Sequence, residues 1–195
     1  MCSEAMDGGE RSVIVSAPSG AGKTTIVRHL IAVFPQLEFS VSATSRVRRA
    51  NETEGRDYFF LDSAAFRSRV DAGEFVEWEE VYPGQFYGTL RSQLDAIWSR
   101  GHCPIFDVDV KGGSHLKELF GQKALALFIS PPSIAALEER LHARGTESVE
   151  SLRKRIGKAQ EEMTWAPHFD ATVVNDRLDR ACAEAERHVR EFLHA

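Results

Sequence analysis

Five runs of apolar residues without polar alternation are spaced along the chain. They occupy 12–16, 39–41, 104–108, 124–130 and 171–174. Apolar runs bounded by turn residues are typical of strands buried on both faces of a sheet. Amphipathic stretches lie between them. In the last such stretch one helical face carries Leu178, Ala181, Cys182, Ala185, Val189 and Phe192. This alternation predicts an α/β fold, a mostly parallel sheet covered by helices.

Two stretches interrupt the alternation. Residues 42–99 hold short strand candidates at 58–61, 75–78 and 87–88, with one helix from about residue 64 and another after 89, which indicates a small α+β insertion. Residues 132–167 carry two helical patterns and no strand. Ser133 and Ser148 are the expected N-caps of these helices, and Gly145 the expected end of the first.

Composition narrows the class of protein. The 195 residues carry a formal net charge of −5, which disfavours sequence-blind nucleic-acid binding because that needs a basic surface. Cys2, Cys103 and Cys182 form no CxxC pair, so we expect no disulfide framework or zinc site, with the latter two as core residues. Residues 1–10 lack a signal-peptide pattern, and no apolar run reaches the roughly 18 residues of a membrane span. We therefore expect a cytoplasmic protein without nucleic-acid or membrane partners.

A glycine-rich loop directly follows the first predicted strand. Because helical spacing begins at Ile26, Val27 and Leu30, strand, loop and helix follow in Walker A order. The glycines let backbone N–H groups converge on a phosphate, and the helix N-terminus adds partial positive charge. Lys23 is expected to reach the β- and γ-phosphates, and the Thr24 hydroxyl to bind Mg²⁺. The predicted nucleoside-triphosphate loop comprises Ala17, Pro18, Ser19, Gly20, Ala21, Gly22, Lys23, Thr24 and Thr25.

An acidic residue ends another predicted strand. Asp107 follows the apolar Phe106, and Asp109 stands two positions later. A carboxylate at a strand end beside a phosphate loop can hold Mg²⁺ directly or through water, as in the Walker B arrangement. An acid after a strand is by itself commonplace, but together with the loop it makes Asp107 a candidate catalytic and metal-binding residue alongside Thr24.

The insertion adds an ordered set of motifs. In chain order they are Ser42-Ala43-Thr44-Ser45-Arg46 with Arg49, Arg56-Asp57-Tyr58-Phe59-Phe60, Glu74-Phe75-Val76-Glu77-Trp78 and Phe86-Tyr87-Gly88-Thr89. Beyond it follow Asp107-Val108-Asp109, Pro131-Pro132-Ser133, Arg144-Gly145-Thr146 and Val174-Asn175-Asp176. Singly, these residues are usually core or solvated surface. In this order they resemble the guanylate kinase family, from about residue 11 to the C-terminus.

The resemblance implies ATP-dependent phosphorylation of GMP, and of dGMP, with Mg²⁺ as cofactor. It implies that Arg46 and Arg49 hold the GMP phosphate and that Tyr58 and Tyr87 hydrogen-bond to it. Guanidinium forks suit a phosphate dianion, and phenols add neutral donors. This dianion is already ionised at neutral pH, because its second pKa is about 6, so no general base is required.

The resemblance also implies which residues surround the base. They are Ser42, Glu77, Thr89 and Asp109. Guanine presents N1–H and its 2-amino group as adjacent donors, which a carboxylate such as Glu77 can accept, while Thr89 can donate to O6. Adenine would meet mismatched partners, and buried polar groups left unpaired are how a site rejects a near-analogue.

Three arginines of 132–167 match family residues that close over the donor phosphates. With Lys23 and Asp107, the residues implied in catalysis are Arg140, Arg144 and Arg155. Cations arriving from a lid stabilise the charge that develops during in-line transfer, and they exclude water. The alternative for these arginines is a charged, solvated helix face.

Several positions depart from the family pattern. Ala17 stands where a Walker A loop usually begins with glycine, Arg48 replaces a usual proline, Asn51 a glycine and Lys111 a glutamine. The segment 81–86, which contains Tyr82-Pro83-Gly84, is one residue longer than usual. The Gly-Ala-Gly-Lys-Thr end of the loop is intact and Arg49 keeps its spacing, while nothing in the sequence explains Lys111 or the longer segment.

The sequence thus predicts a P-loop NTPase core with a five-stranded parallel sheet, formed by residues 11–41, 100–131 and 168–195. Residues 1–10 are expected to be a flexible tail, 42–99 a GMP-binding subdomain and 132–167 a helical lid. The expected partners are ATP and GMP, and the chain is expected to be a monomer or homodimer. Two alternatives remain open: a P-loop kinase for another small acceptor, and a non-catalytic guanylate-kinase-like module that binds phosphopeptides.

Overall fold

A five-stranded parallel sheet forms the centre of the protein, as the sequence predicts. The computed structural model describes residues 10–143 and 149–195. The strand order is β2-β7-β1-β8-β9. The strands are β1 (Ser12–Ser16), β2 (Leu37–Phe39), β7 (Cys103–Val108), β8 (Ala124–Ser130) and β9 (Ala171–Val174). The strand expected at 39–41 lies two residues earlier, although Ser40 still donates its backbone N–H to the Ile105 carbonyl at 3.0 Å.

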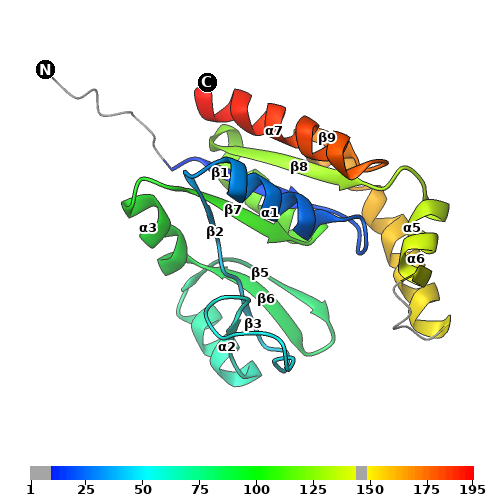
Figure 1. The fold of residues 1–195 in the computed structure, drawn as a ribbon. Helices are drawn as coiled ribbons and strands as arrows, with labels where there is room; N and C mark the ends of the chain where they lie inside the picture. Colours follow the sequence, from blue (N-terminus) through cyan, green and yellow to red (C-terminus); the bar gives the residue numbers. More distant parts are fainter. Residues whose placement is uncertain (1–9, 144–148) are drawn as a thin grey trace, which may run out of the picture.

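Helices cover both faces of this sheet (Figure 1). Val13 and Val15 of β1 pack into one apolar cluster with α1 (Lys23–Val33) and α7 (Leu178–His194). Ile14 points to the other face, where α3 (Arg91–Ser99) and α4 (Val110–Phe120) pack. Burial on both faces explains the unbroken apolar runs. On α7 the predicted face is buried except at Leu178, which is exposed, and Phe192, which is partly buried.

A second, smaller sheet has the order β4-β3-β6-β5. Its strands are β3 (Ala43–Thr44), β4 (Phe59–Phe60), β5 (Phe75–Tyr82) and β6 (Gln85–Leu90). Helix α2 (Ser63–Asp71) closes it through Phe66, whose ring stacks on Phe75 and Phe86 with centroids 4.4 and 5.5 Å away. The predicted strand at 75–78 is four residues too short, because β5 continues with alternating exposure through a charged stretch.

Two helices, α5 (Ile134–Ala143) and α6 (Val149–Met163), pack on each other through Leu137, Leu141, Leu152 and Ala159. Ser133 caps α5 as predicted, since its Oγ accepts the Ala136 N–H at 3.1 Å. The predicted end at Gly145 and the predicted cap at Ser148 lie outside the described residues. Single 3₁₀ turns, η1 (Gly121–Lys123) and η2 (Ala166–His168), precede β8 and β9.

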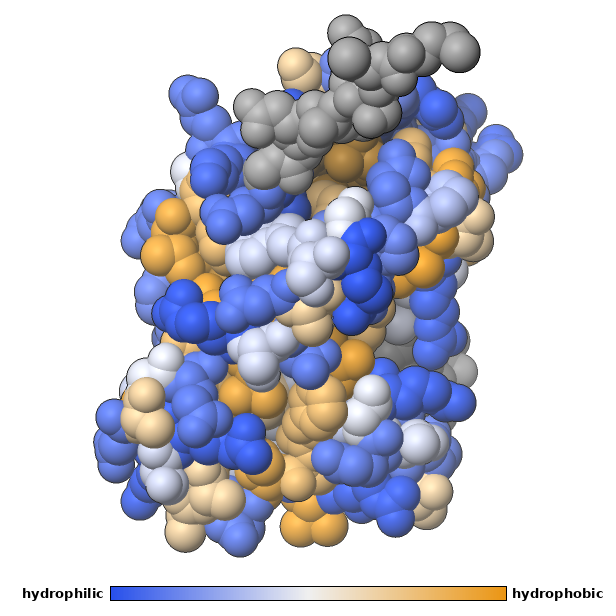
Figure 2. Space-filling model, turned by 90° about the vertical axis from the view of Figure 1, so that its left-hand side faces the viewer, coloured by the Kyte–Doolittle hydropathy of each residue, from blue (hydrophilic) through white to orange (hydrophobic). Residues whose placement is uncertain are grey.

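The surface is mixed in character. On the face in Figure 2, hydrophilic residues surround smaller hydrophobic patches. Cys103 and Cys182 are buried, as expected of core residues. Within the described parts of the chain, no helix combines the length and the apolar character needed to cross a membrane.

Candidate functional site

The glycine-rich loop is held from two sides. Gly20 and Gly22 adopt φ values of +95° and +98°, which favour glycine. A Cβ on Gly22 would lie 2.4 Å from Nδ2 of Asn175, and this buried amide donates to the Ala21 carbonyl at 2.8 Å. A Cβ on Gly20 would lie 2.9 Å from Leu141 on α5. The loop therefore needs glycine for its conformation and for the close approach of its neighbours.

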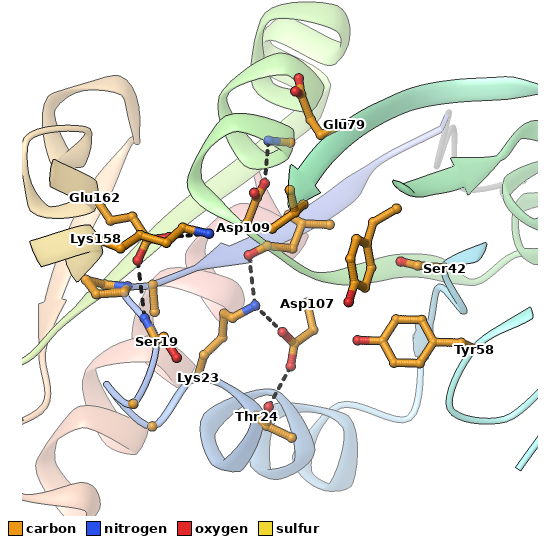
Figure 3. A pocket seen from close by; sticks show the side chains of 18 of the residues that line it. Ser19, Lys23, Thr24, Ser42, Tyr58, Glu79, Asp107, Asp109, Lys158 and Glu162 are labelled. Carbon is orange, nitrogen blue, oxygen red and sulfur yellow. Dashed lines mark hydrogen bonds and ion pairs between the residues drawn. The ribbon is translucent and has the colours of Figure 1, made fainter. Parts of the chain in front are cut away.

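Lys23, Thr24 and Asp107 converge beside this loop, as Figure 3 shows. Nζ of Lys23 forms an ion pair with Oδ1 of Asp107 and donates to the Val108 carbonyl at 2.8 Å. The Thr24 hydroxyl donates to Oδ2 of Asp107 at 2.9 Å. The parallel pairing of β1 with β7 causes this convergence, because it brings the loop after β1 beside the end of β7.

The oxygens of Thr24 and Asp107 fit Mg²⁺, a hard cation that prefers carboxylate and hydroxyl oxygens. Among residues 10–143 and 149–195, no group of three or more His, Cys, Asp or Glu side chains could hold a metal ion. Two protein oxygens are the usual contribution when substrate phosphates and waters supply the remaining ligands.

A pocket of about 380 Å³ extends from the phosphate loop to the second sheet. Of the predicted site residues it brings together Ala17, Pro18, Ser19, Gly20, Gly22, Lys23, Thr24, Thr25, Ser42, Tyr58, Glu77, Tyr87, Asp107 and Asp109. The predicted residues that do not line it are Ala21, Arg46, Arg49, Thr89, Arg140 and Arg155. Arg144 lies outside the described residues. One cavity therefore joins the predicted phosphate-donor and base-binding ends.

Glu77 is a buried carboxyl at the far end of this pocket. Its side chain is 4% exposed, and Oε1 accepts the Thr89 hydroxyl at 2.7 Å. Burial raises the pKa of Glu77 to about 7; the Thr89 hydrogen bond opposes this rise, and the nearby Asp109 carboxylate adds to it. Thr89 is fully buried behind Glu77. Asp109 caps α4, accepting the Gly112 N–H at 2.9 Å.

Arg46 lies in a pair with a residue that the sequence did not single out as functional. Its two terminal nitrogens donate to the carboxylate oxygens of Glu52 at 2.7 and 2.5 Å, and its guanidinium lies 5.0 Å from the Tyr58 ring centroid. The bidentate hydrogen bonds from Arg46 lower the pKa of Glu52 to about 2. Arg49 donates its backbone N–H to Glu52 at 2.9 Å, and its exposed guanidinium forms a longer ion pair with the same carboxylate, at 3.9 Å.

Two tyrosines, Tyr58 and Tyr87, line the pocket, and the Tyr58 ring lies beside Arg46. The rings of Tyr58 and Tyr87 meet edge to face, with centroids 5.9 Å apart. Burial and the Asp107 carboxylate raise the pKa of Tyr58, so its phenol stays a neutral donor. In Figure 3 the Tyr58 hydroxyl and the Ser42 side chain both face into the pocket.

The helical pair reaches the site through residues that sequence reasoning missed. Glu162 of α6 is buried and accepts the Ser19 N–H at 3.3 Å; burial raises its pKa. Lys158, one turn earlier, lines the pocket. The sequence could have indicated both residues, because Lys158 follows Arg155 by three positions and Glu162 follows Lys158 by four. Positions three and four apart share a helix face. Arg140 instead donates to the Asn175 carbonyl at 2.7 Å.

Glu79 is another pocket residue that was missed. Glu77, Glu79 and Val81 alternate along β5, and all three line the pocket. Successive residues of a strand point to opposite faces, so the assignment of Glu77 to the site already implied Glu79.

A parallel sheet with a Walker A loop, a lysine, a threonine and a strand-end aspartate defines a P-loop nucleotide-binding protein. A family model described as "Guanylate kinase" matches residues 9–192. Guanylate kinase of Salinibacter ruber is 50% identical over 181 residues, which are 93% of this chain and 96% of that protein. That of Bacteroides fragilis is 48% identical over 186 residues, 95% of this chain and 91% of that protein.

A solved structure agrees with these relatives. The crystal structure of guanylate kinase from Anaplasma phagocytophilum superposes with a TM-score of 0.76 at 26% identity, covering 95% of this chain and 87% of that one. The chain belongs to the guanylate kinase family, a family of nucleoside monophosphate kinases. The resemblance read from the sequence motifs and the predicted fold class are both confirmed.

Proposed function

We propose that this protein transfers the γ-phosphoryl group of ATP to GMP, and to dGMP, in the cytoplasm, with Mg²⁺. One observation carries the proposal: a single pocket joins the phosphate loop to the buried carboxyl of Glu77. A donor phosphate at one end and a guanine at the other would place the GMP phosphate between them, in reach of transfer.

The donor end supplies charge and backbone donors. The loop amides and the N-terminus of α1 would cradle the β-phosphate, while Lys23 moves from Asp107 toward the transferring group. Thr24 and Asp107 would hold Mg²⁺, which would neutralise charge on the donor phosphates. Arg140, Arg144 and Arg155 are proposed to add cations from the lid.

The acceptor end selects the base and aligns the phosphate. Ionised Glu77 would accept N1–H and the 2-amino group of guanine, with Ser42, Thr89 and Asp109 around the base. Arg46, Arg49, Tyr58 and Tyr87 would bind the GMP phosphate. Glu52 supports this assignment because its bidentate pair fixes the Arg46 guanidinium against the Tyr58 ring.

Catalysis would then consist of positioning and electrostatic stabilisation. The acceptor is an ionised phosphate oxygen at neutral pH, so no side chain has to remove a proton. The proposed division is a core, a GMP-binding subdomain over 42–99 and a lid over 132–167, whose closure would exclude water. A phosphopeptide-binding module is the weaker reading, because it would have no use for the convergence of Lys23, Thr24 and Asp107.

A coupled assay of ADP release with GMP, dGMP, AMP, CMP and UMP tests the proposal. Strong activity with GMP and little with AMP is expected, since Glu77 matches the donor pair that guanine presents. Comparable rates with AMP would overturn the guanine assignment. No turnover with any acceptor, despite ATP binding, would favour a non-catalytic module.

A further inference from the structure

The turn between β5 and β6 is held by a hydrogen bond at its tip. The register of β5 and β6 is irregular between Glu80 and Tyr82, and such irregularities re-aim side chains. Gly84 adopts φ +75° and donates its N–H to Oε1 of Glu80 at 2.7 Å. The longer segment that the sequence left unexplained thus ends in a built turn that presents the Tyr82 ring.

That ring meets a cation from the helical pair, and the same cation also lines the pocket. Nζ of Lys158, on α6, lies 4.8 Å from the Tyr82 ring centroid. The same ammonium lies 3.6 Å from Oε1 of Glu162, whose other oxygen accepts the Ser19 N–H. The chain of contacts therefore runs from the hairpin through α6 to the phosphate loop. In Figure 3, Lys158 and Glu162 stand beside the loop at Ser19.

We propose that Lys158 is a positioning residue, which clasps α6 to the β5–β6 hairpin through the face of Tyr82. The hairpin carries Glu77 and Glu79 at the base-binding end, whereas α6 carries Glu162 against the phosphate loop. A contact between them fixes the distance between the two ends of the pocket. A nucleotide ligand that occupies both ends should therefore be bound more tightly, and this consequence rests on the proposed function.

Among the described residues that line the pocket, Lys158 and Lys23 are the cations. Lys23 pairs with Asp107 and donates to the Val108 carbonyl. Lys158 instead contacts the Glu162 carboxylate and the Tyr82 ring. A cation over an exposed aromatic ring contributes little free energy to the contact. Loss of the ring is therefore expected to change the equilibrium between the formed and the broken contact by about twofold to fivefold.

Hydrogen exchange without nucleotide tests the clasp by itself. Tyr82→Leu should speed exchange of the backbone amides of 152–163 by about twofold to fivefold, although these residues are far away in sequence. Tyr82→Phe keeps the ring face and should exchange like wild type. Lys158→Met removes the Glu162 ion pair as well as the ring contact, so it should speed exchange at least as much as Tyr82→Leu, and the double variant should not exceed Lys158→Met. Arg153→Met, an exposed charge on the same helix, is the matched control.

Unchanged exchange in Tyr82→Leu would overturn the proposal, and so would a Tyr82→Phe variant as fast as Tyr82→Leu. Additive effects in the double variant would also overturn it, because they would show that the two residues act independently. Should Lys158→Met fail to fold, Lys158→Arg replaces it and should exchange like wild type.

Calorimetric titration then measures the consequence with a bisubstrate ligand, in which a phosphate chain joins adenosine to guanosine. The clasp variants should bind it about twofold to fivefold more weakly than wild type, with Tyr82→Phe and Arg153→Met unchanged. Tighter binding by Tyr82→Leu would overturn the positioning role. A wild type that binds neither this ligand nor GMP would refute the proposed function, while the exchange result still decides the clasp.

Discussion

Glu77→Gln tests two properties of the buried carboxyl: how much its ionised form destabilises the folded protein, and how much it contributes to GMP binding. The substitution keeps size and shape but cannot ionise, and its carbonyl can still accept the Thr89 hydroxyl. In the folded protein, burial moves the pKa of Glu77 from an ordinary 4.5 to about 7, with Asp109 adding to the rise. This difference corresponds to about 3 kcal/mol, all of it a penalty on the charged form.

The sign follows from proton binding. Because the folded state holds the proton more tightly, the contribution of Glu77 to stability is present below about pH 4.5 and is lost as the pH rises to about 7. Without nucleotide, the free energy of unfolding of the glutamine variant, taken relative to that of wild type, should therefore rise by about 2–3 kcal/mol between pH 5 and pH 8. Denaturant unfolding of both proteins at the two pH values measures this gain. An equal stability difference at both pH values would refute the reasoning.

Binding should change in the opposite direction. One acceptor replaces two, and an amide donor faces a guanine donor, so GMP binding should weaken by roughly 2–4 kcal/mol while ATP binding hardly changes. Calorimetric titration of both ligands checks this at pH 8. A loss of GMP affinity below about threefold would mean that Glu77 does not read the base. Equal loss of ATP affinity would contradict a local role.

Three further predictions concern the rest of the site. Lys23→Ala should lower turnover at least about a hundredfold in the coupled assay while the protein still folds, and near-normal activity would contradict its role. Gly22→Ala should cost about 1–3 kcal/mol of stability and weaken ATP binding, because it adds backbone strain and a clash with Asn175. The matched control is Gly73→Ala: Gly73 has a φ of +69° and open space around it, so this substitution should add the strain alone and leave ATP binding intact. Glu52→Ala should raise KM for GMP about tenfold and leave KM for ATP unchanged, as expected when a charge-assisted bidentate pair no longer holds Arg46; a matching rise for ATP would argue against that role.

The central sheet was predictable because its strands are buried on both faces, which leaves apolar runs such as 124–130 without interruption. The phosphate loop was predictable because its signal is local: strand, glycines, lysine and helix are contiguous. The strand at 39–41 was misplaced because β2 contains Glu38, whose charged side chain interrupts the apolar run; this carboxylate is paired with Arg100 and His102.

Individual side-chain contacts had no such signal. Nothing in the spacing of residues links Glu52 to the fork of Arg46, or Asn175 to the Ala21 carbonyl. The meeting of Lys158 with Tyr82 depends on the irregular register of a hairpin and on the packing of α6. Such pairs are set by tertiary geometry, and the sequence shows only that their members exist.

The position of β1 at the centre of the sheet has a consequence for biosynthesis. Both of its neighbours, β7 and β8, are translated long after it, and the bond from Ser16 Oγ to the Val108 carbonyl spans 92 residues. At about 5–20 residues per second, β1 waits about 5–20 seconds for its first partner. Asn175, which braces the loop at Ala21, emerges later still. The phosphate loop and its strand are thus among the first segments to be made and the last to be completed, and until β7 and β8 are made β1 has no neighbouring strand to pair with.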